Sequence, residues 1–272
     1  MVHLIGANGY IGLRLTEYLL DKDAKFDSFS NVVDENCKFF DLSKPDCKSL
    51  NLKEDDVVVL MAAISSPDIC ENNYELAHQI NVVGTSLLID YCIAHKVKVI
   101  FFSSDTVNGA TDDKTNDEYS EVNPYGNYAK MKYEIEKKYR DQKYFKTIRL
   151  SYVLSNEDKF TSYLNNCVKS QEKAEVFRGL YRNVIPLETV LEAVYKLINN
   201  FWFNDYYLVN LSGNQNLSRA DLALIYKRDI NQNLEYNIVP TPKLILESRP
   251  NIIKTKSLFL EKLLGHKIKD LL

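Results

Sequence analysis

Cysteine and histidine are scarce in this sequence, and their arrangement excludes several kinds of site. The 272 residues include five cysteines, an odd number without a Cys-x-x-Cys pair, so neither a disulfide framework nor a thiolate metal site is predicted. The four histidines are scattered without the spacing of metal ligands, and we assign no metal. We therefore expect a reducing, cytoplasmic location.

Long apolar runs and a surplus of basic residues are also lacking. No stretch reaches the roughly 18 consecutive apolar residues that a membrane span needs, and the chain opens on the strand-like MVHLIG without the basic flank of a signal peptide. The formal net charge is -3 with acids and bases interspersed, which leaves no basic face for a phosphate backbone. We expect neither a membrane nor a nucleic acid as a partner.

Apolar strands alternate with helical patterns from the first residue onward. Segments 2–5, 55–63, 97–104 and 145–154 are predominantly apolar, as is typical of parallel strands that are covered on both faces. This alternation predicts an α/β fold, a Rossmann-like doubly wound parallel sheet. One of the intervening helices is expected to turn an apolar face to the core, formed by Leu76, Ile80, Val83, Leu87 and Tyr91.

The pattern changes character after about residue 155. Short helices at 189–199 and 218–228 mix with strands around 206–211, and no linker separates the two parts. We expect residues 1–155 to form a dinucleotide-binding domain. Residues 156–272 should form a smaller substrate-binding lobe, interleaved with the last strands of the sheet.

Only nine glycines occur in the chain, and three of them fall in one turn, GANGYIG, between the first strand and the first helix. Glycine permits a tight turn and lets the backbone approach a pyrophosphate, which the helix amino terminus then faces with its N–H groups. The position after the first strand predicts a dinucleotide site. Its candidate cofactor-binding residues are Gly6, Asn8, Gly9, Tyr10, Ile11 and Gly12.

The acid that holds the ribose hydroxyls of NAD at the end of the second strand is missing. Counting from the glycine turn leads to Ser30, whereas Asp27 falls within the strand. A neutral Ser30 removes the repulsion that a carboxylate would offer a 2′-phosphate. No arginine follows to bind that phosphate, although Arg14 could approach it. The sequence favours NADP as the cofactor, with NAD possible.

Ser104, Tyr128 and Lys132 form the candidate catalytic set. Ser104 ends the third apolar strand, at the edge where open α/β sheets bind ligands. Tyr128 and Lys132 stand at i and i+4 and share one helix face, whereas the residue four positions after Tyr125 is Ala129. A lysine one turn away is expected to lower the pKa of the Tyr128 phenol.

These motifs resemble the extended short-chain dehydrogenases/reductases and, among them, the dTDP-4-dehydrorhamnose reductase group. The segments GANGYIG, INVVGT, SSDTVNG and YAKMK follow that family's order and intervals, and GNQNLSRADLA resembles its carboxyl-terminal lobe. The resemblance implies that Tyr128 is the general acid, that Lys132 also holds the nicotinamide ribose, and that Ser104 hydrogen-bonds the carbonyl oxygen. Further cofactor-binding residues that it implies are Asp41, Leu42, Ala62, Ala63 and Asn81.

The resemblance implies an NAD(P)H-dependent reductase of a nucleotide-linked 4-keto-6-deoxy sugar, assembled as a homodimer. Two alternatives stay open, an epimerase or dehydratase that retains its nicotinamide and a non-catalytic regulatory subunit of the same fold. Departures from the family pattern at Ile5, Met61 and Asn108 put the substrate pocket in question. Arg182 and Arg249 could bind a diphosphate, although surface ion pairs are the simpler expectation for each.

Overall fold

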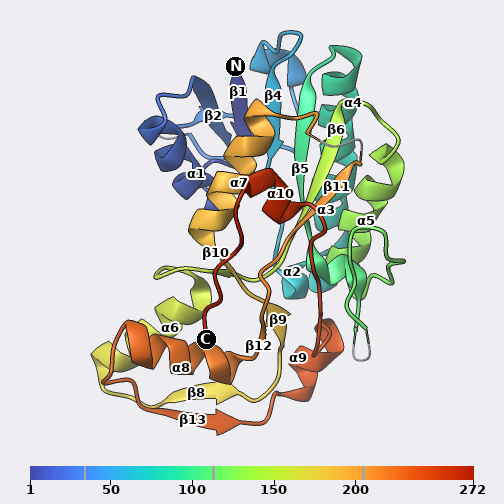
Figure 1. Ribbon diagram of the computed structural model, residues 1–272. Coiled ribbons are helices and arrows are strands. Elements are labelled where there is room, and N and C mark those ends of the chain that lie inside the picture. The colour runs from blue at the N-terminus through green and yellow to red at the C-terminus, as the bar shows by residue number, and fades with distance from the viewer. Residues whose placement is uncertain (34, 112–113, 204–205) are drawn as a thin grey trace.

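The central feature of the computed structural model is a sheet of seven parallel strands with helices on both faces (Figure 1). The structure describes residues 1–33, 35–111, 114–203 and 206–272. A smaller lobe lies below the sheet in the picture. Across the sheet the strands are β11 (Leu208–Leu211), β6 (Phe145–Leu150), β5 (Lys98–Ser104), β4 (Val57–Leu60), β1 (Val2–Ile5), β2 (Phe26–Ser30) and β3 (Lys38–Phe39).

The strand order confirms the predicted doubly wound fold. From β1 the chain builds outward through β2 and β3 on one side, and then returns to build β4, β5 and β6 on the other. The carboxyl ends of β1 and β4 therefore lie at the point where the order reverses. This is the place at which open parallel sheets bind ligands.

The two faces of the sheet carry separate cores, which explains why β4, in the centre of the sheet, is apolar throughout. In β4, Val57 and Val59 face one core, whereas Val58 and Leu60 face the other. The first core is closed by α1 (Tyr10–Asp21), α7 (Leu187–Asn199) and α10 (Leu260–Leu264). The second is closed by α3 (Tyr74–His78), α4 (Thr85–Ala94) and α5 (Asn127–Tyr139).

The chain beyond β6 contributes both to the sheet and to the lobe. Strand β11 and helices α7 and α10 return to the sheet, while the lobe has a small core of its own around Leu164, Val176 and Ala223. The lobe elements are α6 (Lys159–Ser170), β8 (Ala174–Phe177), α8 (Arg219–Asp229), β13 (Tyr236–Val239) and α9 (Lys243–Ser248). Short pairs join β7 (Val153–Leu154) to β10 (Ile185–Pro186) and β9 (Arg182–Asn183) to β12 (Asn216–Leu217).

The expected apolar face of the helix after β4 is wrong. Leu76, Val83 and Leu87 are exposed, and a different stripe that includes Leu88 is buried. Both stripes are apolar, so periodicity did not separate them. The π-helical turn η2 (Gln79–Gly84) also interrupts the helix and changes which side chains share a face.

Gly6 is required by the backbone where β1 meets β4. Its φ is +92°, and a Cβ atom there would lie 2.6 Å from the Ala62 backbone nitrogen. A side chain would therefore be strained both by conformation and by contact with a neighbouring main chain.

We expect Gly6→Ala to lower the free energy of unfolding by about 3 kcal/mol, because left-handed strain and overpacking add together. Gly265→Ala is the matched control, since Gly265 also has a positive φ of +79° but no atom within 4 Å of the added Cβ. It should cost only about 1 kcal/mol. Urea unfolding followed by circular dichroism measures both values, and equal losses would contradict the close approach of Gly6 to Ala62.

Candidate functional site

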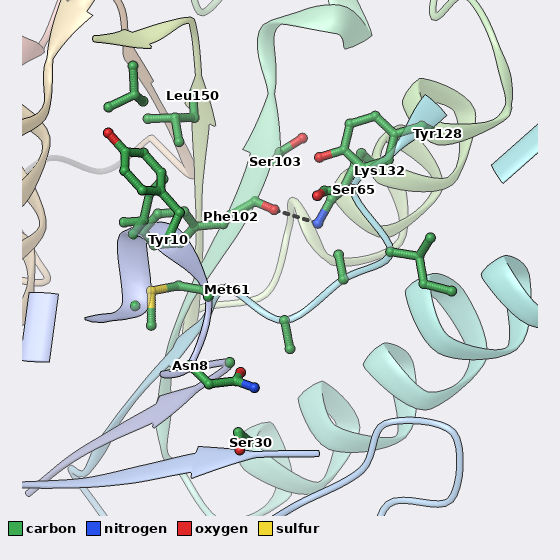
Figure 2. Close-up of a pocket in the computed structure, with 18 of the residues that line it drawn as sticks. Asn8, Tyr10, Ser30, Met61, Ser65, Phe102, Ser103, Tyr128, Lys132 and Leu150 are labelled. Carbon is green, nitrogen blue, oxygen red and sulfur yellow. Dashed lines mark hydrogen bonds between the residues drawn. The ribbon is translucent and has the colours of Figure 1, made fainter. Parts of the chain in front are cut away.

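A cavity of about 700 Å³ lies at the carboxyl ends of the central strands (Figure 2). In Figure 2, Ser30 and Asn8 lie at one end, Tyr128 and Lys132 lie at the other, and Met61 is between them. Its size is that of a site for a cofactor or a small ligand. The predicted residues that line it are Gly6, Asn8, Gly9, Tyr10, Ile11, Gly12, Ser30, Asp41, Leu42, Ala62, Ala63, Tyr128 and Lys132.

The glycine turn brings the amino terminus of α1 to the cavity wall. Gly9 is the N-cap of α1 and makes no side-chain capping bond, and the first turn of the helix carries no acid. A Cβ atom on Gly12 would lie 2.4 Å from the Gly6 carbonyl oxygen, so the helix packs directly on the turn. This geometry fits the pyrophosphate of a dinucleotide, because free N–H groups and the positive end of the helix dipole face the same space.

At the other side of the turn, two polar side chains are held by local bonds. The Ser30 hydroxyl donates to the Val32 carbonyl, and the Asp41 carboxylate accepts from the Ser43 backbone at 2.8 Å and from the Ser43 hydroxyl at 2.6 Å. Both side chains still line the cavity. They are therefore fixed in position at the end of the cavity formed by β2 and the loop after β3.

Arg14, considered for a 2′-phosphate, forms ion pairs with two carboxylates. Its guanidinium pairs with Glu17 at 2.7 Å and with Glu157. Asp27 lies within β2, as expected, and pairs with Lys38 at 2.7 Å.

Asn81 acts on the cavity through its neighbour. Its amide accepts from the Ile64 nitrogen at 2.8 Å and donates to the Ile64 oxygen at 3.0 Å, and it is 2% exposed. Ile64 lines the cavity, whereas Asn81 is not among the described lining residues. Asn81 thus fixes the segment after β4 that contains Ala62 and Ala63.

Lys132 places a buried ammonium beside the Tyr128 ring. Its Nζ donates to the Phe102 carbonyl at 2.7 Å, and it lies 4.6 Å from the centroid of the Phe101 ring and 5.9 Å from that of Tyr128 (Figure 2). Burial lowers the pKa of Lys132 to about 8, against the opposing charge of Glu136. The ammonium is therefore protonated near neutral pH, but it loses its proton far more readily than an exposed lysine.

The pKa of Tyr128 shifts in the direction opposite to the one expected. Burial raises the pKa of the phenol well above its usual value, and the charges of Cys70 and Asp105 raise it further. In the protein alone, desolvation is the largest cause of this rise. The phenol therefore carries its proton at neutral pH, which suits a proton donor.

Ser104 takes part in local hydrogen bonds at the end of β5. Its hydroxyl accepts from the Thr106 nitrogen at 3.2 Å and from the Thr106 hydroxyl at 2.9 Å, and it is not among the described lining residues. Ser103 lines the cavity instead, but its hydroxyl donates to Glu136 at 2.5 Å. The structure thus brings Tyr128 and Lys132 together with the glycine turn, whereas Ser104 is not among the described residues that line the cavity.

Asn108 belongs to a buried polar network and not to the cavity. Its amide donates to Thr255 at 2.9 Å and accepts from Arg149 at 3.3 Å, and Arg149 forms an ion pair with Glu136 at 2.6 Å. Arg149 and Glu136 are 2% and 0% exposed. The departure from the family pattern at Asn108 therefore concerns the join between α5, the sheet and the carboxyl-terminal segment.

The outlying candidates of the sequence lie outside this cavity. Tyr125 is 46% exposed and donates to the Glu247 carbonyl at 2.7 Å. Arg249 pairs with Asp68 at 3.2 Å, in accord with the simpler expectation. Arg182 does not form the expected ion pair, because its guanidinium donates to backbone carbonyls, among them that of Pro250 at 2.8 Å.

Several lining residues were missed by sequence reasoning. Tyr152, Asp158 and Arg219 line the cavity from the lobe side, and Asp105 is buried close to Tyr128. Asp105 lies in SSDTVNG and Arg219 in GNQNLSRADLA, so both motifs pointed to them, but neither had been assigned a role.

The described residues offer neither a metal site nor a membrane-spanning helix. Residues 1–33, 35–111, 114–203 and 206–272 contain no group of three or more His, Cys, Asp or Glu side chains placed to hold a metal ion. Within the same residues, no helix is both long enough and apolar enough to cross a membrane.

The doubly wound sheet and the cavity against its glycine turn define the extended short-chain dehydrogenase/reductase fold. The chain belongs to the family described as the RmlD substrate binding domain, which matches residues 1–244. The resemblance drawn from the sequence is thereby confirmed.

Individual relatives agree with this assignment. A dTDP-4-dehydrorhamnose reductase of Mycolicibacterium smegmatis is 32% identical over 127 residues, which are 45% of this chain and only 37% of that protein. A solved dTDP-4-dehydrorhamnose reductase of Clostridium acetobutylicum has a TM-score of 0.83 at 20% identity, covering 98% of this chain and 94% of its own.

Epimerases share the same architecture. A UDP-glucose 4-epimerase of Stenotrophomonas maltophila, solved with NAD and formylated UDP-arabinopyranose, also has a TM-score of 0.83, at 17% identity, with 99% of this chain and 94% of its own covered. Likenesses at this level of identity show the fold and leave the reaction open.

We expect the pH dependence of stability to report the buried ammonium of Lys132. Between the folded pKa of about 8 and the unfolded value of about 10.4, the unfolded chain binds a proton that the native protein lacks, so this group makes the free energy of unfolding rise with pH. Lys132→Met removes that rise. Relative to the variant, the native protein should gain about 2 kcal/mol between pH 7 and pH 10.

Urea unfolding at pH 7, 8, 9 and 10 measures this difference. Lys130→Met is the control, because Lys130 is exposed on the same helix and its removal should leave the native pH profile unchanged. Parallel profiles for the native protein and Lys132→Met would contradict a buried ammonium.

Proposed function

We propose that the protein is an NAD(P)H-dependent reductase of a nucleotide-linked 4-keto-6-deoxy sugar. The observation that carries this proposal is that Tyr128 and Lys132 line the same cavity as the glycine turn. A proton donor and a dinucleotide site that open into one enclosed space can serve a single carbon–oxygen bond. Membership of the RmlD family supports the class of substrate.

The cavity offers one set of residues to each part of the cofactor. The turn from Gly6 to Gly12 would hold the pyrophosphate, and Ser30, Asp41 and Leu42 would lie beside the adenosine. Ala62 and Ala63 have small side chains that leave room along the cavity floor, and Lys132 would hold the nicotinamide ribose. When bound, the reduced nicotinamide supplies the hydride.

Tyr128 then acts as the general acid in the reduction. Its raised pKa keeps the proton on the phenol until negative charge develops on the carbonyl oxygen. The ammonium of Lys132, held by the Phe102 carbonyl, stabilises the phenolate that remains after the transfer. Ser104 is proposed to hydrogen-bond the carbonyl oxygen, with its hydroxyl oriented by the two bonds that it accepts from Thr106.

We propose NADPH as the preferred form of the cofactor, with NADH also accepted. Ser30 is neutral and stands where an acid would repel a 2′-phosphate. Because Arg14 is committed to Glu17 and Glu157, the preference rests on the absence of repulsion at Ser30 and should be modest.

The proposal also covers the smaller lobe, which would bind the substrate, and the assembly of two copies of the chain. We assign substrate binding to residues 156–272. Two residues of this part, Asp158 and Arg219, line the cavity close to Tyr152. We also propose a homodimer, because exposed apolar side chains gather on α3, η2 and α4, where Leu76 and Leu87 are 53% and 51% exposed.

Replacement of the two neighbouring tyrosines tests the assignment of the acid. Tyr128→Phe should lower kcat by about 1000-fold with NADPH and a dTDP-4-keto-6-deoxy sugar, because the proton donor is lost. Tyr125→Phe should keep most of the native rate, since Tyr125 lies on the surface. NADPH oxidation is followed at 340 nm. Equal loss in both variants would refute the role of Tyr128.

The same assay separates a reductase from its alternatives. A reductase consumes one NADPH for each sugar, an epimerase or dehydratase with a retained nicotinamide consumes none, and a regulatory subunit shows no turnover.

Substitution at Ser30 tests the choice of cofactor. Ser30→Asp should raise the KM for NADPH by about 10-fold or more while changing the KM for NADH little, because a carboxylate repels the 2′-phosphate. Ser30→Ala is the control for losing the local bond to Val32, and it should preserve the native preference. If Ser30→Asp left the ratio of the two KM values unchanged, Ser30 would not face the ribose.

A further inference from the structure

Arg219 presents a cation to the cavity from the lobe. It is the first residue of α8, and its guanidinium carbon lies 4.2 Å from the centroid of the Tyr152 ring and 4.8 Å from that of Phe160. Its Nη1 nitrogen is buried and has no hydrogen-bond partner among the residues that the structure describes. The rings thus orient a planar donor group with part of its bonding capacity unused.

The acids at this end of the cavity are committed to other partners. The Asp158 carboxylate accepts from the Tyr152 hydroxyl, from the Phe160 nitrogen at 2.9 Å and from the Thr161 hydroxyl at 2.6 Å. Glu157 pairs with Arg14. Within the described chain, Arg219 forms no ion pair with a carboxylate, so its charge is available to a ligand.

A second arginine strengthens the positive field. Arg182 is half-buried. Burial lowers its pKa, the charge of Asp105 opposes this shift, and the charges of Arg219 and Arg249 lower the pKa further. Arg219 and Arg182 are therefore close enough to repel one another. The positive charge that Arg182 adds beside Arg219 favours the binding of an anion.

We propose that Arg219 binds an oxyanion of the nucleotide-sugar substrate and thereby selects for it, an inference that rests on the proposed function. The oxyanion belongs either to the diphosphate or to a carboxylate on the sugar, and both offer the planar pair of oxygens that a guanidinium recognises. The pyrophosphate of the cofactor has its own place at the glycine turn.

The stacked geometry predicts that lysine cannot replace this arginine. A guanidinium held over two aromatic rings keeps its donors in one plane, whereas an ammonium on a flexible stem offers a single point charge. Substitution should therefore weaken substrate binding even when the charge is kept.

Calorimetric titration of the full-length protein, preloaded with NADPH, tests the proposal. The probes are dTDP, UDP-glucose and UDP-glucuronate, and the variants are Arg219→Met, Arg219→Lys and Arg228→Met. Arg228 is the matched control, because it lies on the same helix, is exposed and pairs with Asp229 at 2.6 Å. We expect Arg219→Met to weaken dTDP binding by about 30-fold and Arg219→Lys by about 10-fold, while Arg228→Met binds as the native protein does.

The probes separate the two sources of the oxyanion. Weakening of all three ligands by Arg219→Met assigns the diphosphate, and weakening of UDP-glucuronate alone assigns a sugar carboxylate. Thermal unfolding without ligand controls for folding: Arg219→Met should keep or raise the native Tm, since a buried donor without a partner is removed.

Three results would overturn the proposal, and they are distinguishable. Native affinity of Arg219→Met for every probe would show that Arg219 takes no substrate anion and would leave the reductase proposal standing. Loss of NADPH affinity in that variant, with native binding of the three probes, would assign the residue to the cofactor. Failure of the native protein to bind any of the probes would remove the nucleotide-sugar function and the role of Arg219 together.

Discussion

The burial of the Lys132 ammonium is the constraint on which the site depends. An ammonium that is 3% exposed is unfavourable unless polar groups surround it, and here the Phe102 carbonyl at the end of β5 accepts its hydrogen bond. Helix α5 carries Tyr128, Lys132 and Glu136 at successive turns of one face. The Tyr128 phenol, the Lys132 ammonium and the Glu136 carboxylate therefore follow one another along the helix, from the cavity into the protein interior.

The last member of that series is held by the sheet. Glu136 forms a fully buried ion pair with Arg149 of β6 and also accepts from Ser103 of β5, so α5 is fixed against both strands. Separating the two partners of such a pair would leave an uncompensated buried charge. This cost holds Glu136 and Arg149 in contact. The orientation of Tyr128 therefore depends on polar contacts that begin more than two helical turns away from its hydroxyl.

Sequence patterns predicted the parts of the structure that depend on local chemistry. The strand Val2–Ile5 and the glycine turn follow from an apolar run and from backbone requirements that only glycine meets, and the pairing of Tyr128 with Lys132 follows from helical spacing. Properties that depend on tertiary surroundings were not predictable in the same way. Leu87 is exposed although it shares the character of buried Leu88, and the pKa of Tyr128 rises because the phenol is buried.

The residues at the cavity likewise include some that local sequence predicted and some that depend on tertiary packing. Ser104 ends its strand as expected, but it forms local bonds with Thr106 and is not among the described lining residues. Arg219 was not predicted, because its place on the wall depends on how the lobe packs beside Tyr152, some 67 positions earlier in the chain.

A crystal structure with NADP⁺ bound tests the central claim most directly. We predict that the pyrophosphate lies against the turn from Gly6 to Gly12, with the nicotinamide ring beside the Tyr128 hydroxyl and its ribose within hydrogen-bonding distance of Lys132. A dinucleotide bound elsewhere, or bound here with the nicotinamide turned away from Tyr128, would contradict it.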